Sequence, residues 1–318
     1  MEDFDFYPQK PNLVESKQKS SLSLTVFSLV LFVLVFVLFF GSDEINFIVY
    51  LIGVLIVHEL GHFVAMKYFK YENVRMLFVP LMGAFVQGKK NNFSQKQSFL
   101  VILAGPLPGV IAGGIIMWYG SFFHTDWMLP FGALFILLNL INLVPLDPLD
   151  GGQLLKLFAT RNHEMFLMVF AFISSIAIIA VGFYIPHYGY LLIIFGFFMG
   201  FRVRALQKQY QMHKELKQVN VDYATSYNLL SNKDYAKIKE VIIQNTPQLQ
   251  KYIDHLSEDQ TDPIIASQVN SVLIAPIDRD ASVFFKFMIL FSWIGSFLIP
   301  IGLYFVLDWP WIWSVFYM

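Results

Sequence analysis

The most constraining feature of the sequence is a long apolar run that contains three titratable residues. Residues 45–65 read INFIVYLIGVLIVHELGHFVA, which is long enough to cross a bilayer as one α-helix. His58, Glu59 and His62 lie within this run. Because such side chains are costly in hydrocarbon, they are rarely kept there without a function. The run therefore predicts a membrane-spanning helix that carries a functional site.

The spacing of these three residues is that of a metal site. His58 and His62 are four residues apart, so an α-helix places both imidazoles on one face, as two ligands of a tetrahedral zinc require. Glu59 lies beside them, where its carboxylate can take a proton from an attacking water. We expect His58 and His62 to be metal ligands and Glu59 to be the catalytic base. A chance match to HExxH is the alternative, and the cost of burying His and Glu in a membrane argues against it.

A second segment supplies the third ligand. Residues 142–152 read NLVPLDPLDGG and follow another apolar run. The prolines end the helix, and the glycine pair predicts a tight bend after Asp150. An aspartate on such a broken helix end can reach a metal that a neighbouring helix holds, so Asp150 is the expected third ligand.

Asp147 is the competing candidate, three residues before Asp150. Pro148 follows Asp147 directly and restricts its backbone, whereas Asp150 precedes flexible glycines. The chain has no cysteine, so a metal must be held by His, Asp or Glu.

Together the two motifs resemble those of the site-2 protease family of intramembrane zinc metalloproteases. That family pairs HExxH on one transmembrane helix with NxxPxxxLDG on a later one. The matching residues are His58, Glu59 and His62 in the first motif and Asn142, Pro145, Leu149, Asp150 and Gly151 in the second. The resemblance covers about residues 45–155. It implies one Zn²⁺ per chain and hydrolysis of peptide bonds in transmembrane or juxtamembrane segments of other membrane proteins.

The start of the next apolar segment departs from the family pattern. Family members often have GPxxN here, but Gly109 stands in place of the asparagine. The segment is rich in small residues from Ala104 to Gly114, and small residues let helices approach closely in lipid. We therefore expect this segment to pack against the catalytic helix.

Residues 74–88 predict a small membrane-associated β element, because bulky residues are interrupted there by Pro80 and Gly83. The family resemblance implies that such an element lies near the active site and pairs with the substrate. An exposed strand edge can hold an extended segment through main-chain hydrogen bonds. Gly83 and Phe85 are therefore candidate substrate-positioning residues, with a purely structural hairpin as the alternative.

Asn142 is the third candidate for substrate positioning or for stabilising the oxyanion. A helix–helix hydrogen bond would explain this asparagine equally well.

Two other functions remain open on the sequence alone. The first is a non-catalytic relative that binds membrane helices, which the presence of the ligands and the base argues against. The second is a polytopic transporter with a metal or ion site. Such a protein would use intramembrane His and Glu, but the LDGG motif would be unexplained.

The composition is that of a multi-pass membrane protein, with 56% hydrophobic and 14% charged residues. The net charge of −1 argues against a nucleic-acid partner. The expected fold is all-α, with about seven spans, the small β element and a small cytosolic helical segment. The expected spans are residues 22–40, 45–68, 98–119, 129–146, 167–185, 188–201 and 283–307.

The chain is expected to have four parts. Residues 1–21 form a polar arm, and 22–204 form the transmembrane metalloprotease core. Residues 205–281 form two or three short helices, as either an interaction module or a solvated linker. Residues 282–318 form the last span and an outer aromatic tail.

Basic residues predict the orientation in the bilayer. Segments 41–44, 120–128, 185–189 and 308–318 contain no Lys or Arg, whereas 66–97 and 202–217 are rich in them. The positive-inside rule then places the N-terminus in the cytosol and the site near the cytosolic leaflet. The expected location is a prokaryotic cytoplasmic membrane.

This orientation predicts how single cysteines react in the cysteine-free chain. Ser121→Cys should react with a membrane-impermeant thiol reagent in intact cells, and Ser231→Cys should react only after permeabilisation. The opposite labelling pattern would show that the protein has the inverted orientation in the bilayer. Labelling of both positions in intact cells would show that the expected number of spans is wrong by one.

Overall fold

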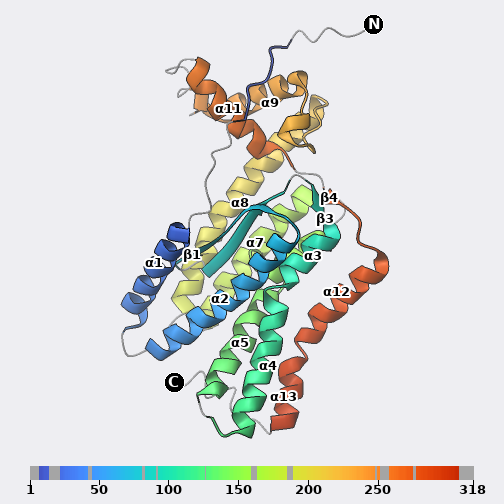
Figure 1. Ribbon diagram of the computed structural model, residues 1–318. Coiled ribbons are helices and arrows are strands. Elements are labelled where there is room, and N and C mark those ends of the chain that lie inside the picture. Colours follow the sequence, from blue (N-terminus) through green and yellow to red (C-terminus); the bar gives the residue numbers. More distant parts are fainter. Residues whose placement is uncertain are drawn as a thin grey trace.

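The computed structural model describes residues 7–13, 22–41, 45–80, 83–90, 92–125, 127–158, 163–184, 189–247, 249–250, 258–274 and 277–307. The protein is mostly helical, with two small sheets. Apolar helices form a bundle, and α8 extends from the bundle to a small group of helices at one end (Figure 1). The expected aromatic tail at 308–318 and most of the polar arm lie outside the described residues.

The first two expected spans are single helices, α1 (Leu22–Phe40) and α2 (Ile45–Tyr68). The third is broken at Gly105 into α3 (Gln95–Leu103) and α4 (Pro106–Phe122). The fourth is α5 (Met128–Leu143). The last is divided into α12 (Val283–Ser296) and α13 (Ile299–Leu307).

Three helical segments of the described chain are long and apolar enough to cross a membrane: Ile45–Tyr68, Gln95–Phe122 and Met165–Tyr184. Shorter apolar helices at Leu22–Leu38, Met128–Leu143 and Val283–Ser296 do not reach that length. The expected count of about seven spans is therefore not confirmed. The apolar stretches are present as helices, but several of these helices are too short to be counted as membrane spans by length alone.

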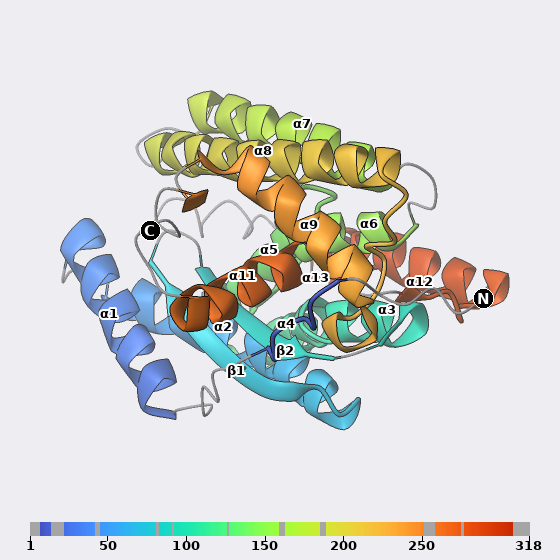
Figure 2. The same cartoon turned by 90° about the horizontal axis from the view of Figure 1, so that it is seen from above.

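The hairpin of α7 (His163–Tyr184) and α8 (Gly189–Gln218) forms a separate layer, in which the two helices lie side by side (Figure 2). Close contact is possible because Gly196 faces α7, where the Ser175 hydroxyl donates to its carbonyl at 2.7 Å. The expected short span 188–201 is the apolar beginning of α8. The helix continues without a break through the expected boundary at residue 204.

The expected β element is an antiparallel hairpin of β1 (Glu72–Val79) and β2 (Gly83–Lys89), with Val79 opposite Gly83. Gly83 has a φ of 89°, which favours glycine at the turn. Two hydroxyls of α1 hold β1. The Thr25 hydroxyl donates to the Met76 carbonyl at 2.7 Å, and the Phe78 N–H donates to Ser28 Oγ at 3.2 Å. A second, two-residue sheet pairs β3 (Phe93–Ser94) with β4 (Ile277–Asp278) in parallel.

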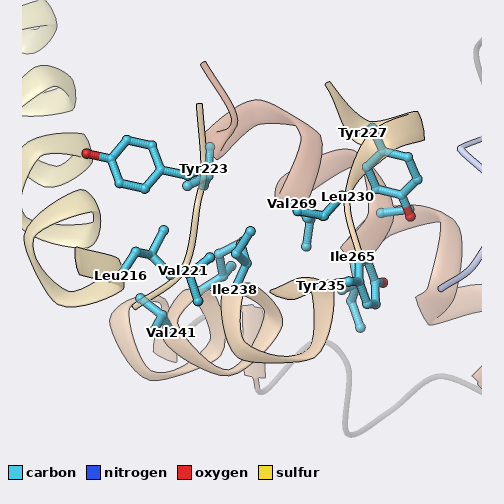
Figure 3. Close-up of a cluster of buried hydrophobic side chains, with 13 residues drawn as sticks. Leu216, Val221, Tyr223, Tyr227, Leu230, Tyr235, Ile238, Val241, Ile265 and Val269 are labelled. Atoms are coloured by element: carbon cyan, nitrogen blue, oxygen red, sulfur yellow. The ribbon is translucent and has the colours of Figure 1, made fainter. Parts of the chain in front are cut away.

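The last part of the fold is a helical module, made of the end of α8, a 3₁₀ turn η2 (Tyr227–Leu229), α9 (Asn232–Asn245) and α11 (Glu258–Val272). Its elements enclose an apolar core (Figure 3). The buried residues of this core are Leu216, Val221, Tyr223, Tyr227, Leu230, Tyr235, Ile238, Val241, Ile242, Ile265, Ala266, Val269 and Val272. The segment is therefore a packed unit rather than a solvated linker.

Small residues of α4 allow close packing, as the sequence indicates. An added Cβ at Gly61 of α2 would lie 2.0 Å from the Ala104 carbonyl oxygen, which explains the close approach of α2 to the α3–α4 break. Further along α4, an added Cβ at Gly113 would lie 2.7 Å from the Gly132 carbonyl oxygen of α5. The small residues therefore serve contacts with both α2 and α5.

The α4–α5 contact predicts that Gly113→Ala is destabilising. The new methyl group would press on backbone atoms of α5, and overpacking of this kind costs about 1–3 kcal/mol. Gly200→Ala in α8 is the matched control, because nothing lies within 4 Å of its added Cβ. Thermal unfolding of the purified variants, followed by circular dichroism, should give a lower midpoint for Gly113→Ala alone. Equal midpoints would contradict this packing.

Candidate active site

Helix α2 presents the HExxH motif to the interior of the protein. His58, Glu59 and His62 are all buried, with 4%, 5% and 8% of their surfaces exposed. The Nε2 atoms of the two histidines are 3.2 Å apart. The helical spacing therefore brings both imidazoles to one point, as the sequence predicts.

Asp150 meets the two histidines from a different helix. It is the first residue of α6 (Asp150–Phe158), and its Oδ2 lies 3.1 Å from His58 Nε2 and 3.2 Å from His62 Nε2. Ligand atoms on a tetrahedral zinc with bonds of about 2.1 Å are roughly 3.4 Å apart. The three side chains form a group with the spacing of a metal site.

The hydrogen bonds of the histidines fix which nitrogen is available. His58 Nδ1 lies 2.7 Å from Asn139 Oδ1, and His62 Nδ1 lies 2.8 Å from the Val101 carbonyl oxygen. Both partners accept hydrogen bonds, so each neutral ring carries its proton on Nδ1 and a lone pair on Nε2. Two lone pairs and a carboxylate oxygen then face one another. A cation between them removes this repulsion, so the donor set fits a metal ion.

Asn139 is a residue of the candidate site that the sequence motifs do not include. It is fully buried on α5, and its amide group donates to the Phe135 carbonyl at 2.7 Å, which turns Oδ1 toward His58. The signal for it was an amide in an apolar helix, one turn before Asn142. The neighbouring glycine explains the departure from GPxxN, because a Cβ at Gly109 would lie 2.3 Å from Asn139 Nδ2.

Asp147 lies in a separate ion-pair network. Its buried carboxylate accepts hydrogen bonds from Lys156 of α6 and from Arg202 Nε of α8, the latter at 2.6 Å. Its backbone N–H donates to Ser174 Oγ of α7 at 3.0 Å. Asp147 thus joins three helices, while Asp150 faces the histidines.

The glycine pair has a different role from the one expected. Gly151 and Gly152 do not bend the chain after Asp150 but lie in the first turn of α6. An added Cβ would lie 2.0 Å from the Leu143 carbonyl oxygen at Gly151, and 2.3 Å from the Leu146 carbonyl oxygen at Gly152. The glycines are needed because α6 packs directly on the end of α5 and the segment that follows it.

The three donors and Glu59 open into a cavity of about 690 Å³. Glu59 Oε2 is buried and has no hydrogen-bond partner in the described part of the chain. Other cavity-lining residues are Ala84, Phe85 and Val86 of β2, Asn142 of α5, Gln153 of α6, and Phe195, Phe198, Met199 and Arg202 of α8.

Of the three candidate substrate-positioning residues, two line the cavity and one lies at the hairpin turn. Phe85 and Asn142 line the cavity, and the Asn142 amide group donates to the Leu138 carbonyl at 3.1 Å. Gly83 stands at the turn that begins β2.

Comparison with family models gives a match to peptidase family M50 at residues 46–127. The matched segment contains the HExxH motif and the β hairpin and ends before Asp150. The match covers about a quarter of the chain and, with the apolar helices, supports a membrane metalloprotease. It also supports the resemblance to the site-2 protease family that the two motifs indicate.

A solved structure of a site-2 protease from Methanocaldococcus jannaschii is similar to this chain. It has a TM-score of 0.43 and 19% sequence identity, and the similarity covers 57% of this chain and 86% of that one. Comparison with curated proteins found no match.

The different surroundings of the two aspartates predict different effects on metal content. Asp150→Ala removes one of three donors and should leave the purified protein with little metal, as measured by mass spectrometry. Asp147→Ala should keep the metal but unfold at a lower temperature, because it leaves two cations without their buried partner. If Asp147→Ala lost the metal and Asp150→Ala kept it, Asp147 would be the third metal ligand in place of Asp150.

Proposed function

We propose that the protein is an intramembrane zinc endopeptidase, which hydrolyses peptide bonds in transmembrane or juxtamembrane segments of other membrane proteins. The observation that carries this proposal is the meeting, in one cavity, of three inward-facing donors with a carboxylate whose Oε2 has no hydrogen-bond partner in the described chain. His58, His62 and Asp150 supply the donors, and Glu59 supplies the carboxylate.

His58, His62 and Asp150 would hold one zinc ion per chain. A bound zinc ion polarises the scissile carbonyl and makes water acidic enough to ionise near neutral pH. Asn139 and the Val101 carbonyl keep both imidazoles in the tautomer that binds a metal through Nε2.

Glu59 is the group that moves protons in this proposal. Its buried position beside the donors places its carboxylate where the attacking water enters the site. Glu59 takes the proton of that water and then passes it to the leaving amine, so the carboxylate is restored after each cleavage. Burial keeps bulk water from competing for this carboxylate.

The β hairpin supports binding of an extended substrate. Residues 84–86 of β2 line the cavity, and in the described chain β2 pairs only with β1, so its second edge is available for main-chain hydrogen bonds. Phe85 offers an apolar contact beside this edge. Asn142 is the candidate for holding the substrate carbonyl or its oxyanion, since its amide has a second N–H beyond the one bound to Leu138.

The residues that α8 and α6 add to the cavity fit a segment drawn from the bilayer. Phe195, Phe198 and Met199 of α8 are apolar, whereas Arg202 of α8 and Gln153 of α6 are polar. The apolar side chains would receive substrate side chains, and the polar part would admit the water that hydrolysis requires. We place this polar part toward the cytosolic leaflet of a prokaryotic cytoplasmic membrane, in agreement with the basic residues near it.

Replacement of the base tests the proposal directly. Glu59→Gln should reduce cleavage of a model single-span substrate in proteoliposomes by at least about 10²-fold, because the amide cannot accept the proton. Metal content and unfolding temperature should stay near those of the parent protein. Glu72→Gln on the exposed start of β1 is the matched control and should cleave normally. Near-normal cleavage by Glu59→Gln would reject the mechanism.

A further inference from the structure

The N-terminal segment lies on the helical module, although more than 200 residues separate the two in the sequence. Residues 7–13 read YPQKPNL and run beside the module near α9 and α11 (Figures 1 and 2). Most of this segment is exposed, while Lys10, Pro11 and Leu13 are half-buried. The segment is thus bound at the surface through a few residues and is not part of the core.

The ammonium group of Lys10 is held by three backbone carbonyls. Its Nζ lies 2.8 Å from the carbonyl oxygen of Tyr227, 3.1 Å from that of Asn228 and 2.5 Å from that of Leu230. An ammonium group has three N–H donors, so these carbonyls match it one for one. Tyr227 and Asn228 belong to η2 and Leu230 follows it, so one short turn supplies all three carbonyls; that of Tyr227 also accepts from the Leu230 N–H at 3.3 Å.

The main chain on both sides of this lysine is also held. The Lys10 N–H donates to Asn232 Oδ1 at 3.1 Å, and the Tyr227 hydroxyl donates to the Pro11 carbonyl at 2.7 Å. The Tyr227 ring lies under the ammonium group at 5.3 Å, within the range of a cation–π contact. Leu13 supplies an apolar contact with the module core three residues later.

The binding site comes from one short stretch of the module. Tyr227, Asn228, Leu230 and Asn232 lie within six residues, and Tyr227 and Leu230 are fixed by the core (Figure 3). The bound segment adds the Lys10 ammonium group, two main-chain hydrogen bonds and the Leu13 side chain to this stretch. Pro8 and Pro11 favour an extended chain, which lowers the entropy lost on binding.

We propose that residues 227–232 form a recognition site for an extended peptide segment that presents a lysine, and that residues 7–13 of this chain occupy the site as its own ligand. The carbonyl cage selects an ammonium group, the two main-chain contacts select an extended backbone, and the core edge accepts an apolar residue three positions after the lysine. The site is independent of the proposed proteolysis.

The site lies apart from the proposed metal donors. Leu13 packs on the module core, whereas α1 begins at residue 22 and holds β1 through Thr25 and Ser28. A competing segment with the same chemistry would replace residues 7–13 on the module without touching the proposed metal donors.

Peptide binding tests the site. A fluorescent peptide of residues 7–13 should bind the chain lacking residues 1–13 in detergent, with saturable fluorescence anisotropy. The same peptide with norleucine at the lysine position should bind at least tenfold more weakly, and so should the parent peptide to the intact chain, whose site is occupied. If the truncated chain keeps a folded module by limited proteolysis and does not bind the peptide, or binds both peptides equally, the proposal is overturned.

A second measurement applies even if truncation unfolds the module. A spin label on Gln9→Cys in the otherwise intact chain should be immobile and should become mobile when Lys10→Met is added. Lys237→Met is the matched control, because this lysine also donates to a module carbonyl, that of Val219, but lies outside the cage. The label should stay immobile in that control. An immobile label in the Lys10→Met chain would overturn the proposal.

Discussion

Three acceptor atoms that face one another in a buried position are the constraint on which the rest of the structure depends. The lone pairs of His58 and His62 and the carboxylate of Asp150 repel unless a cation lies among them, so the fold must hold each one in place. Each is held from a different helix: Asn139 of α5 orients His58, and the Val101 carbonyl of α3 orients His62. The close packing that these contacts need explains the glycines around the site. Gly61, Gly109 and Gly151 are thus best understood as the positions that allow close packing around the candidate metal donors.

Two aspartates three residues apart have different roles: Asp147 forms ion pairs between helices, and Asp150 belongs to the candidate metal site. The Asp147 carboxylate accepts hydrogen bonds from Lys156 and Arg202 and so connects α6 with α8. Ser174 Oγ of α7 accepts a hydrogen bond from the Asp147 N–H. A buried charge of this kind is stable only while its partners stay in place, so the network fixes where α6 begins. The beginning of α6 is the position of Asp150. The ion pairs of Asp147 therefore help to position Asp150, the candidate metal donor, without belonging to the donor set.

Local rules predicted the parts of the site that depend on spacing along one helix or on a motif. The four-residue separation of His58 and His62 placed both on one face, and the strands flanking Gly83 followed from alternating bulky residues and a turn. The sequence could not show Asn139 as the partner of His58, because that contact joins residues 81 positions apart. It also predicted a bend at Gly151, where the glycine instead allows α6 to pack on the Leu143 carbonyl. Glycine is favoured both at bends and at close contacts, and only tertiary packing separates the two. The expected number of spans is not confirmed, because the apolar runs at Leu22–Leu38, Met128–Leu143 and Val283–Ser296 form helices that are too short to count as spans by length alone.

Three described parts of the chain connect the helical module to the rest of the protein: α8, the segment that carries Lys10, and β4, which follows α11 and pairs with β3. Helix α8 leaves the module and contributes Phe195, Phe198 and Met199 to one wall. The N-terminal segment leaves the Lys10 cage and leads through α1 to β1, whose partner strand β2 contributes Phe85 to another wall. A continuous helix transmits displacement stiffly, whereas a segment held by one lysine and a few hydrogen bonds can be released. The third connection is also held to the bundle, because Asp280 accepts from the Ser94 hydroxyl at 2.5 Å and from the Lys96 N–H at 3.0 Å. The module therefore stays joined to the bundle through α8 and β4 when Lys10 leaves its site, and the Lys10 segment is the connection that a competing peptide can replace.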